Sequence, residues 1–93
     1  MAYEIITPAV VREQIQVLPP EAKDKIAEAL RAIELVPWSA GTAWRTRHNA
    51  DVPDEDVPIR QLCFGPPGSG FIHYLILQSQ DAVELLDVFW TEL

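Results

Sequence analysis

Residues suited to binding an anion lie close together in the middle of the chain. Trp44, Arg45, Arg47 and His48 fall within five residues, and cationic side chains hold phosphate through charge-assisted hydrogen bonds. The residues that follow, 51–56, are acidic and interrupted by a proline. One interpretation is a functional loop whose basic half binds an anion while its acidic half repels or mimics one. We favour the alternative, a surface loop held by its tryptophans with its charges in water.

These residues belong to a longer segment, 37–58, whose apolar residues follow neither a helical nor a strand period. Loops of this length are uncommon in a compact domain unless they are functional or partly disordered. The elements before and after the segment therefore decide where its candidate residues lie.

A strand at 3–6 and two helices are predicted before this segment. Thr7 is suited to cap the first helix, which runs from Pro8 to about residue 17, because proline at the first helical position loses no needed hydrogen bond. The second helix begins near Pro20, repeats apolar residues at spacings of three and four, and stops at Pro37. Its apolar stripe comprises Ala22, Ile26, Ala29, Leu30, Ile33 and Val36.

Three strands are predicted after the segment, at 59–64, 70–77 and 83–90. The run 70–77 is the most strand-like in the chain, because aromatic and β-branched residues crowd into it and a Pro- and Gly-rich turn precedes it. Short connections favour an antiparallel meander. The predicted fold is a single α+β domain, 1–93, with the order β-α-α-β-β-β and a helical hairpin packed on one face of a small antiparallel sheet.

The last three strands are apolar on both faces, and we expect the helices to cover the face with fewer polar residues. The expected core face comprises Leu62, Phe64, Ile72, Tyr74, Ile76, Leu86, Val88 and Trp90. The opposite face comprises Gln61, Cys63, Phe71, His73, Leu75, Leu77, Leu85 and Phe89. A mostly apolar exposed face on a small protein marks a binding surface.

The formal net charge of −7 is unfavourable for non-specific nucleic-acid binding, which needs clustered Lys and Arg, although a local basic patch remains compatible with this charge.

No apolar run reaches membrane-spanning length, and the start of the chain lacks a signal peptide, so we expect a cytoplasmic protein. The single cysteine, Cys63, lies in a predicted strand, where we expect a small core or half-buried residue and not a nucleophile. We expect neither a cofactor nor a metal site.

The order of elements and the residues that mark it resemble the RelE/ParE superfamily of toxins from bacterial type II toxin–antitoxin pairs. The resemblance lies in residues 3–10, in Leu18-Pro19-Pro20-Glu21-Ala22 before an amphipathic helix, and in the strands that begin at Ile59 and Gly70. It implies a cytoplasmic bacterial toxin that inhibits growth and is neutralised by an antitoxin. RelE-like members cut messenger RNA in the ribosome, whereas ParE-like members inhibit DNA gyrase.

The resemblance transfers few catalytic residues to this chain. RelE-like sites take Arg or Lys from alternate positions of the strand at 59–64, where this chain has Ile59, Gln61 and Cys63. They place an Arg beside the aromatic residue that opens the next strand, but Phe71 has none. They add a basic residue and a Tyr after the last strand, and residues 89–93 contain neither. We therefore expect action by binding, with an mRNA endoribonuclease that uses a divergent Arg/His set as the alternative.

RNA cleavage needs an acid or base and cations that stabilise the phosphate. The residues available for that alternative are Arg45, Arg47, His48, Arg60 and His73. For each of them we favour a structural role, such as pairing of Arg60 with an acidic neighbour.

The partner-binding residues are expected on the second sheet face. They are Phe71, Leu75, Leu85 and Phe89. The expected partner is a cognate antitoxin or a second copy of the chain, with the ribosome and its mRNA, or DNA gyrase, as cellular targets.

Overall fold

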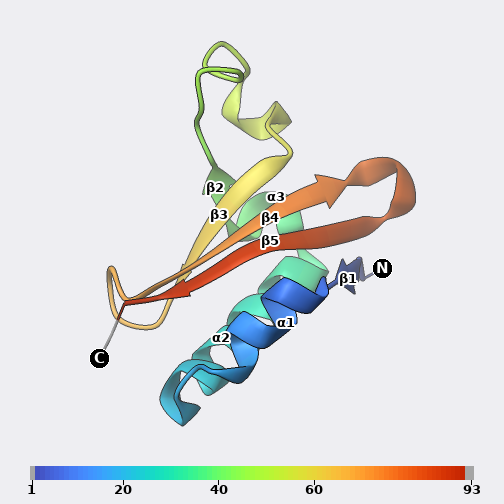
Figure 1. Ribbon diagram of the computed structural model, residues 1–93. Helices are drawn as coiled ribbons and strands as arrows, with labels where there is room; N and C mark the ends of the chain where they lie inside the picture. The colour runs from blue at the N-terminus through green and yellow to red at the C-terminus, as the bar shows by residue number, and fades with distance from the viewer. Residues whose placement is uncertain (1, 92–93) are drawn as a thin grey trace.

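The computed structural model describes residues 2–91, which form a five-stranded sheet with helices against one face (Figure 1). The strands are β1 Glu4–Ile6, β2 Thr42–Ala43, β3 Ile59–Phe64, β4 Gly70–Leu77 and β5 Ala82–Trp90. The helices are α1 Ala9–Gln16, α2 Pro20–Leu35 and α3 Pro37–Ala40, with 3₁₀ turns at Asp54–Asp56 and Gln78–Gln80. Glu92 and Leu93, at the end of the C-terminal segment considered above, lie outside the described residues.

The strand order is β1-β5-β4-β3-β2. Strands β3, β4 and β5 form the predicted antiparallel meander, and the bounds of β3 and β4 agree with the prediction. Strand β1 pairs in parallel with β5, so the first strand lies beside the last. The α+β class is confirmed.

Helix α2 begins at Pro20, as predicted, and ends two residues before Pro37, but the cap of α1 differs from the prediction. Pro8 is the N-cap of α1 and no side chain caps it, so the prediction that Thr7 would do so is wrong. On α2 the predicted stripe is confirmed by the complete or nearly complete burial of Ala22, Ile26 and Ile33, whereas Leu30 is only partly buried against the core. The inclusion of Val36 in the stripe is wrong, because Val36 follows the last residue of α2 and is 51% exposed.

The core lies between these helices and the sheet, with Ile72, Tyr74 and Ile76 of β4 at its centre. Two predicted positions on β5 are exchanged. Leu85 is 1% exposed and belongs to the core, whereas Leu86 lies outside it. The predictions of Leu86 as core and of Leu85 as part of the open face are therefore wrong.

The physical cause of this exchange is a β-bulge. The register between β4 and β5 shifts between His73 and Tyr74, so that Tyr74 lies opposite Leu85 while His73 lies opposite Asp87. Leu86 is the extra residue, and one extra residue in a strand reverses which alternate positions face the core. Val83 and Leu85 before the bulge therefore face the helices.

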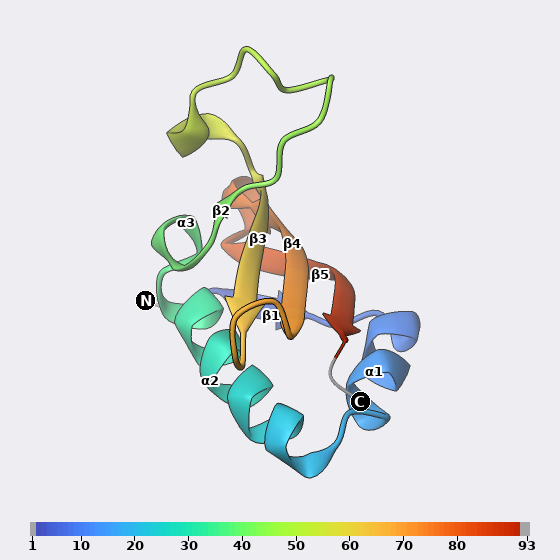
Figure 2. The same cartoon turned by 90° about the vertical axis from the view of Figure 1, so that its left-hand side faces the viewer.

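The segment 37–58 is more ordered than predicted, because it contains α3, β2 and one 3₁₀ turn. Its longest stretch without helix or strand is 44–53. This stretch, called the protruding loop below, extends beyond the sheet at the end away from the helices (Figures 1 and 2). Between residues 2 and 91, no helix combines the length and apolarity that a membrane span requires.

Candidate functional site

The sheet face opposite the helices carries an aromatic cluster centred on His73. The Trp44 indole stacks on the His73 imidazole, with ring centroids 3.9 Å apart and planes 12° from parallel. Phe89 meets the same imidazole edge-on at 5.8 Å. The protruding loop thus begins directly over the sheet, and its first residue leaves His73 only 8% exposed.

The two ring nitrogens of His73 have different surroundings. Its Nε2 lies 2.8 Å from Oε1 of Gln61, which can only accept, so Nε2 carries the proton. Its Nδ1 is buried and has no hydrogen-bond partner in the described part of the chain. Burial lowers the pKa of His73, and the nearby carboxylate of Asp87 opposes that shift. His73 is therefore a weak base covered by an indole.

Arg60 lies in the interior, 5% exposed, and binds backbone instead of the acidic side chain that we expected. Its guanidinium donates to the carbonyl oxygens of Asp54, Val57 and Gly41 at 2.9–3.0 Å. It also lies over the Trp38 ring, 5.7 Å from the centroid. These bonds join α3, the start of β2 and the end of the segment 37–58 to β3, and they leave Arg60 little capacity for a phosphate.

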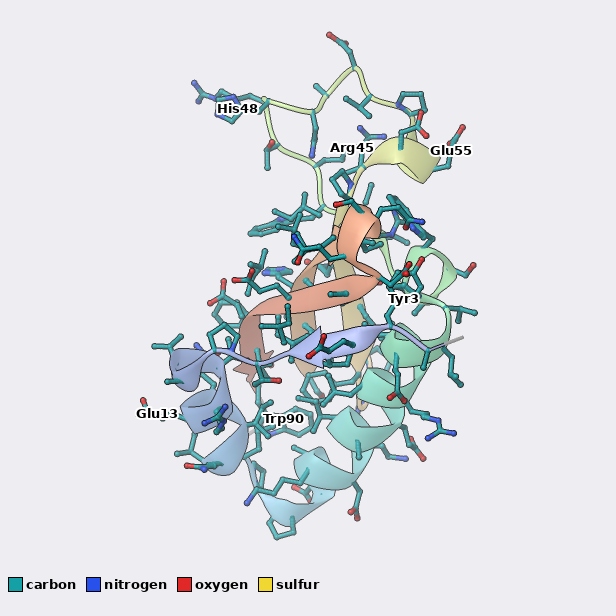
Figure 3. All side chains as sticks on the ribbon, turned by 90° about the vertical axis from the view of Figure 1, so that its right-hand side faces the viewer. Tyr3, Glu13, Arg45, His48, Glu55 and Trp90 are labelled. Carbon is teal, nitrogen blue, oxygen red and sulfur yellow. The ribbon has the colours of Figure 1, made fainter. Side chains whose placement is uncertain are left out.

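Arg45 braces the protruding loop from within. It donates to the carbonyl oxygens of Asn49 and Val52, both at 2.7 Å, and pairs with the carboxylate of Asp54. The basic and acidic halves of the segment therefore neutralise each other in part, which corrects the prediction that these charges would simply be solvated. Arg45 is committed to this loop (Figure 3).

Arg47 and His48 are exposed, and His48 points away from the sheet near the end of the protruding loop (Figure 3). The five candidate catalytic residues are thus distributed over the interior, the loop and the covered sheet face. Of the five, only His73 lies on the face of β3, β4 and β5 opposite the helices, where it pairs in register with Asp87 of β5.

The remaining face residues have different degrees of exposure. Phe71 and Leu75 are half-buried, Phe89 is 45% exposed, and Cys63 is exposed, so the expectation that Cys63 is core or half-buried is wrong. Sequence reasoning missed the roles of Trp44 and Gln61 around His73. The strand alternation does place Gln61 and His73 on one face, but nothing local indicates that Trp44 folds back over them.

No protein-family model and no curated protein matches this chain in sequence. Solved structures do match its fold. The chain is similar to the Escherichia coli toxin RelE, a double arginine-to-alanine mutant in complex with an antitoxin RelBc peptide. That likeness has a TM-score of 0.75 at 12% identity and covers 100% of this chain and 87% of RelE.

It is also similar to the toxin–antitoxin complex RelBE2 of Mycobacterium tuberculosis, with a TM-score of 0.63 at 17% identity over 98% of this chain and 93% of the other. The same RelE mutant in its free state gives a TM-score of 0.66 at 15% identity, over 99% and 86% of the two chains. The protein therefore has the RelE-like toxin fold over its described length.

Proposed function

We propose that this protein is the toxin of a bacterial type II toxin–antitoxin pair, inhibits growth, and is neutralised by a cognate antitoxin. The support is the RelE-like fold, because two of the similar structures are toxins bound to an antitoxin or an antitoxin peptide. The half-exposed and exposed aromatic residues of the open sheet face, Phe71 and Phe89, supply apolar surface for such a partner.

We further propose that the toxin acts by binding its target and not by cutting RNA. The observation that carries this proposal is that Arg60 and Arg45 already form hydrogen bonds within the protein. Arg60 donates to three backbone carbonyl oxygens, and Arg45 is bound to its own loop. Cleavage of RNA needs cations placed at the phosphate in the transition state, and the open face offers Gln61 and Cys63 at the corresponding positions of β3.

The first test is cleavage. The purified protein is added to ribosomes translating a defined messenger RNA, and cuts are mapped by primer extension, with E. coli RelE as the positive control. We expect no codon-positioned cuts. Cuts that vanish in His73→Gln or in the double variant Arg47→Ala, His48→Ala would overturn the binding mechanism and restore the endoribonuclease alternative.

The second test is the cellular effect. Induction of the protein in a bacterial host is expected to stop growth, and co-induction of the small gene next to its own is expected to restore it. Supercoiling by purified DNA gyrase and translation by purified ribosomes, each measured with and without the protein, then distinguish the two classes of target. Normal growth at high expression would overturn the toxin proposal itself.

A further inference from the structure

Two carboxylates share the open face of the sheet because of the β-bulge in β5. Glu84 and Asp87 are three residues apart, and side chains at that spacing in a regular strand point to opposite faces. Leu86 is the extra residue between them, so both carboxylates face away from the helices. In the register with β4, Glu84 lies opposite Leu75 and Asp87 lies opposite His73. The bulge therefore brings two negative charges to one side of the sheet.

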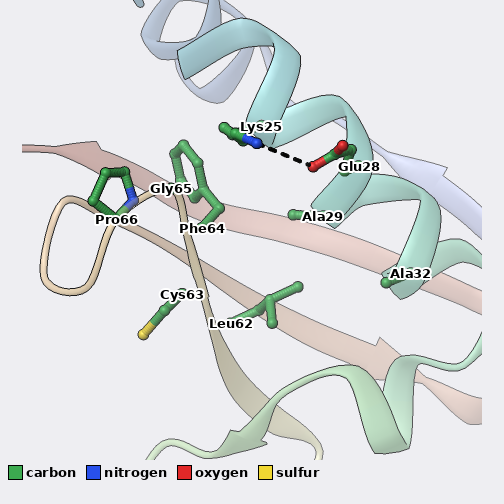
Figure 4. A pocket seen from close by; sticks show the side chains of 9 residues that line it. All are labelled: Lys25, Glu28, Ala29, Ala32, Leu62, Cys63, Phe64, Gly65 and Pro66. Carbon is green, nitrogen blue, oxygen red and sulfur yellow. Dashed lines mark ion pairs between the residues drawn. The ribbon is translucent and has the colours of Figure 1, made fainter. Parts of the chain in front are cut away.

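Neither carboxylate has a basic partner between residues 2 and 91. In the groove between α2 and the end of β3, by contrast, Glu28 pairs with Lys25 at 4.0 Å (Figure 4). Glu84 and Asp87 are half-buried and form no ion pair within the described residues. Arg60 is the only Lys or Arg in the described strands, and it is buried and bonded to backbone. The open sheet face is therefore acidic.

The same face contains an unsatisfied acceptor and aromatic rings. Nδ1 of His73, a side chain only 8% exposed, has no hydrogen-bond partner in the described part of the chain. A buried acceptor without a donor costs free energy, and a ligand that brings N–H groups supplies one. Trp44 and Phe89 each contact the His73 ring and are partly exposed, so they can rotate to admit such a ligand. Carboxylates beside aromatic rings attract an organic cation through charge and through cation–π contact.

We propose that this part of the open face binds an arginine side chain of a protein partner, with the guanidinium between Glu84 and Asp87 and against the aromatic rings. The inference rests on the proposed toxin function and specifies the chemistry of the partner. A guanidinium suits these residues better than an ammonium group does, because it is planar, presents N–H donors to two carboxylates and stacks on aromatic rings.

Two other classes of ligand fit this face less well. No three His, Cys, Asp or Glu side chains between residues 2 and 91 lie close enough together to hold a metal ion. A phosphate would be repelled by the two carboxylates, and the chain as a whole carries −7. Cys63, Phe71 and Phe89 form a neighbouring row across the three strands. The residues beside the partner's arginine should therefore be apolar, as a protein segment allows.

The experiment titrates the full-length protein with a short peptide that carries one arginine between two leucines, and follows the His73 ring signals by NMR. The same peptide with citrulline in place of arginine keeps the shape of the side chain and removes its charge. We expect the arginine peptide to bind more tightly by about fivefold or more, and its advantage to shrink at high salt. The nitrogen signal of His73 Nδ1 should shift, because that atom gains a donor.

Two substitutions of equal charge separate this site from the net charge of the protein. Asp87→Asn removes a carboxylate from the open face, and Asp24→Asn removes one from the exposed surface of α2. We expect Asp87→Asn to weaken binding of the arginine peptide by about fivefold or more and Asp24→Asn to stay within about twofold. Thermal melting shows that both variants are folded. Equal binding of the two peptides, unchanged His73 signals, or equal effects of the two substitutions would overturn the arginine site.

A parallel titration with a short oligouridylate RNA tests the nucleic-acid alternative. We expect no shift of the His73 signals, and a shift that Asp87→Asn enlarges would overturn the arginine site and favour the endoribonuclease. Growth arrest on induction tests the toxin function independently of both titrations. A protein that stops growth but ignores the arginine peptide would contradict only the arginine site. One that binds the peptide at His73 without stopping growth would contradict only the toxin function.

Discussion

Trp44 and His73 are stacked rings whose centroids lie 3.9 Å apart, although one belongs to the protruding loop and the other to the middle of β4. This contact couples the position of the loop to the ionisation of a buried imidazole. The loop is thereby fixed at its first residue by the stack and farther along by Arg45.

Removal of the indole should change the ionisation of His73. In Trp44→Ala the imidazole is exposed to water, and because burial is the main cause of its lowered pKa, the pKa should rise toward 6.5. An NMR titration of the His73 ring protons measures this, and Trp44→Phe, which keeps an aromatic cover, should shift the pKa less. An unchanged pKa in Trp44→Ala would show that Trp44 does not shield the imidazole.

Folding stability should fall in mild acid because of His73. Its folded pKa is lowered, so the unfolded chain binds the proton first as the pH falls through the usual value of 6.5. This contribution to stability is complete above that value and is lost between it and the lower folded pKa. Urea unfolding at about pH 7.5 and about pH 5.5 should show a larger loss for wild type than for His73→Gln. Equal losses in the two proteins would contradict the assignment.

Arg60→Ala should destabilise the fold and not merely remove a surface charge. The substitution leaves the carbonyl oxygens of Asp54, Val57 and Gly41 without their donor. A cost of roughly 2–5 kcal/mol in the free energy of unfolding is expected. The control Arg12→Ala, at an exposed arginine, should cost within about 0.5 kcal/mol. Chemical denaturation measures both, and a neutral Arg60→Ala would contradict the structural role.

The two apolar positions Ile33 and Leu30 on α2 should differ in their contribution to stability. Ile33 is 0% exposed, whereas Leu30 is only partly buried. Ile33→Ala should cost roughly 2–5 kcal/mol, and Leu30→Ala should cost less. Denaturant midpoints of the two variants check this order, and a reversed order would contradict the packing of α2 on the sheet.

Substitutions at Phe71 and Phe89 on the open sheet face should weaken partner binding. Leu85, which strand alternation places on the same face, should behave differently because it belongs to the core. Phe71→Glu and Phe89→Glu should leave the protein folded and weaken its complex at both low and high salt, because apolar contacts are not screened. Leu85→Glu should instead unfold the protein, since Leu85 is 1% exposed. Sedimentation and circular dichroism distinguish these outcomes. A folded Leu85→Glu protein would contradict the bulge.

The elements themselves were predictable from the chain, because propensity and period are local. The run Gly70–Leu77 and the stripe of α2 carry such signals. The bulge at Leu86 was not predictable, because it follows from pairing with β4 and reverses the faces without a local marker such as glycine. It moved Leu85 from the expected binding surface into the core.

The candidate site was less predictable than the fold, because the sequence gives the charged residues but not the groups with which they form hydrogen bonds and ion pairs. The strand pattern around Arg60 does not predict its hydrogen bonds to the carbonyl oxygens of Asp54, Val57 and Gly41, because these residues lie outside the strand. Likewise, Arg45 belongs to the basic part of the segment 37–58 and Asp54 to its acidic part. Only the folded structure brings these two residues together.

The parallel pairing of β1 with β5 has a consequence for synthesis of the chain. Ile5 lies opposite Val83. Strand β1, which is synthesised first, can therefore pair only after β5 has been synthesised. A nascent chain on the ribosome holds the helical hairpin but no completed sheet, because long-range pairing forms only when both segments are present. The sheet is therefore completed only after β5, the last of its strands along the chain, has been made and has left the ribosome.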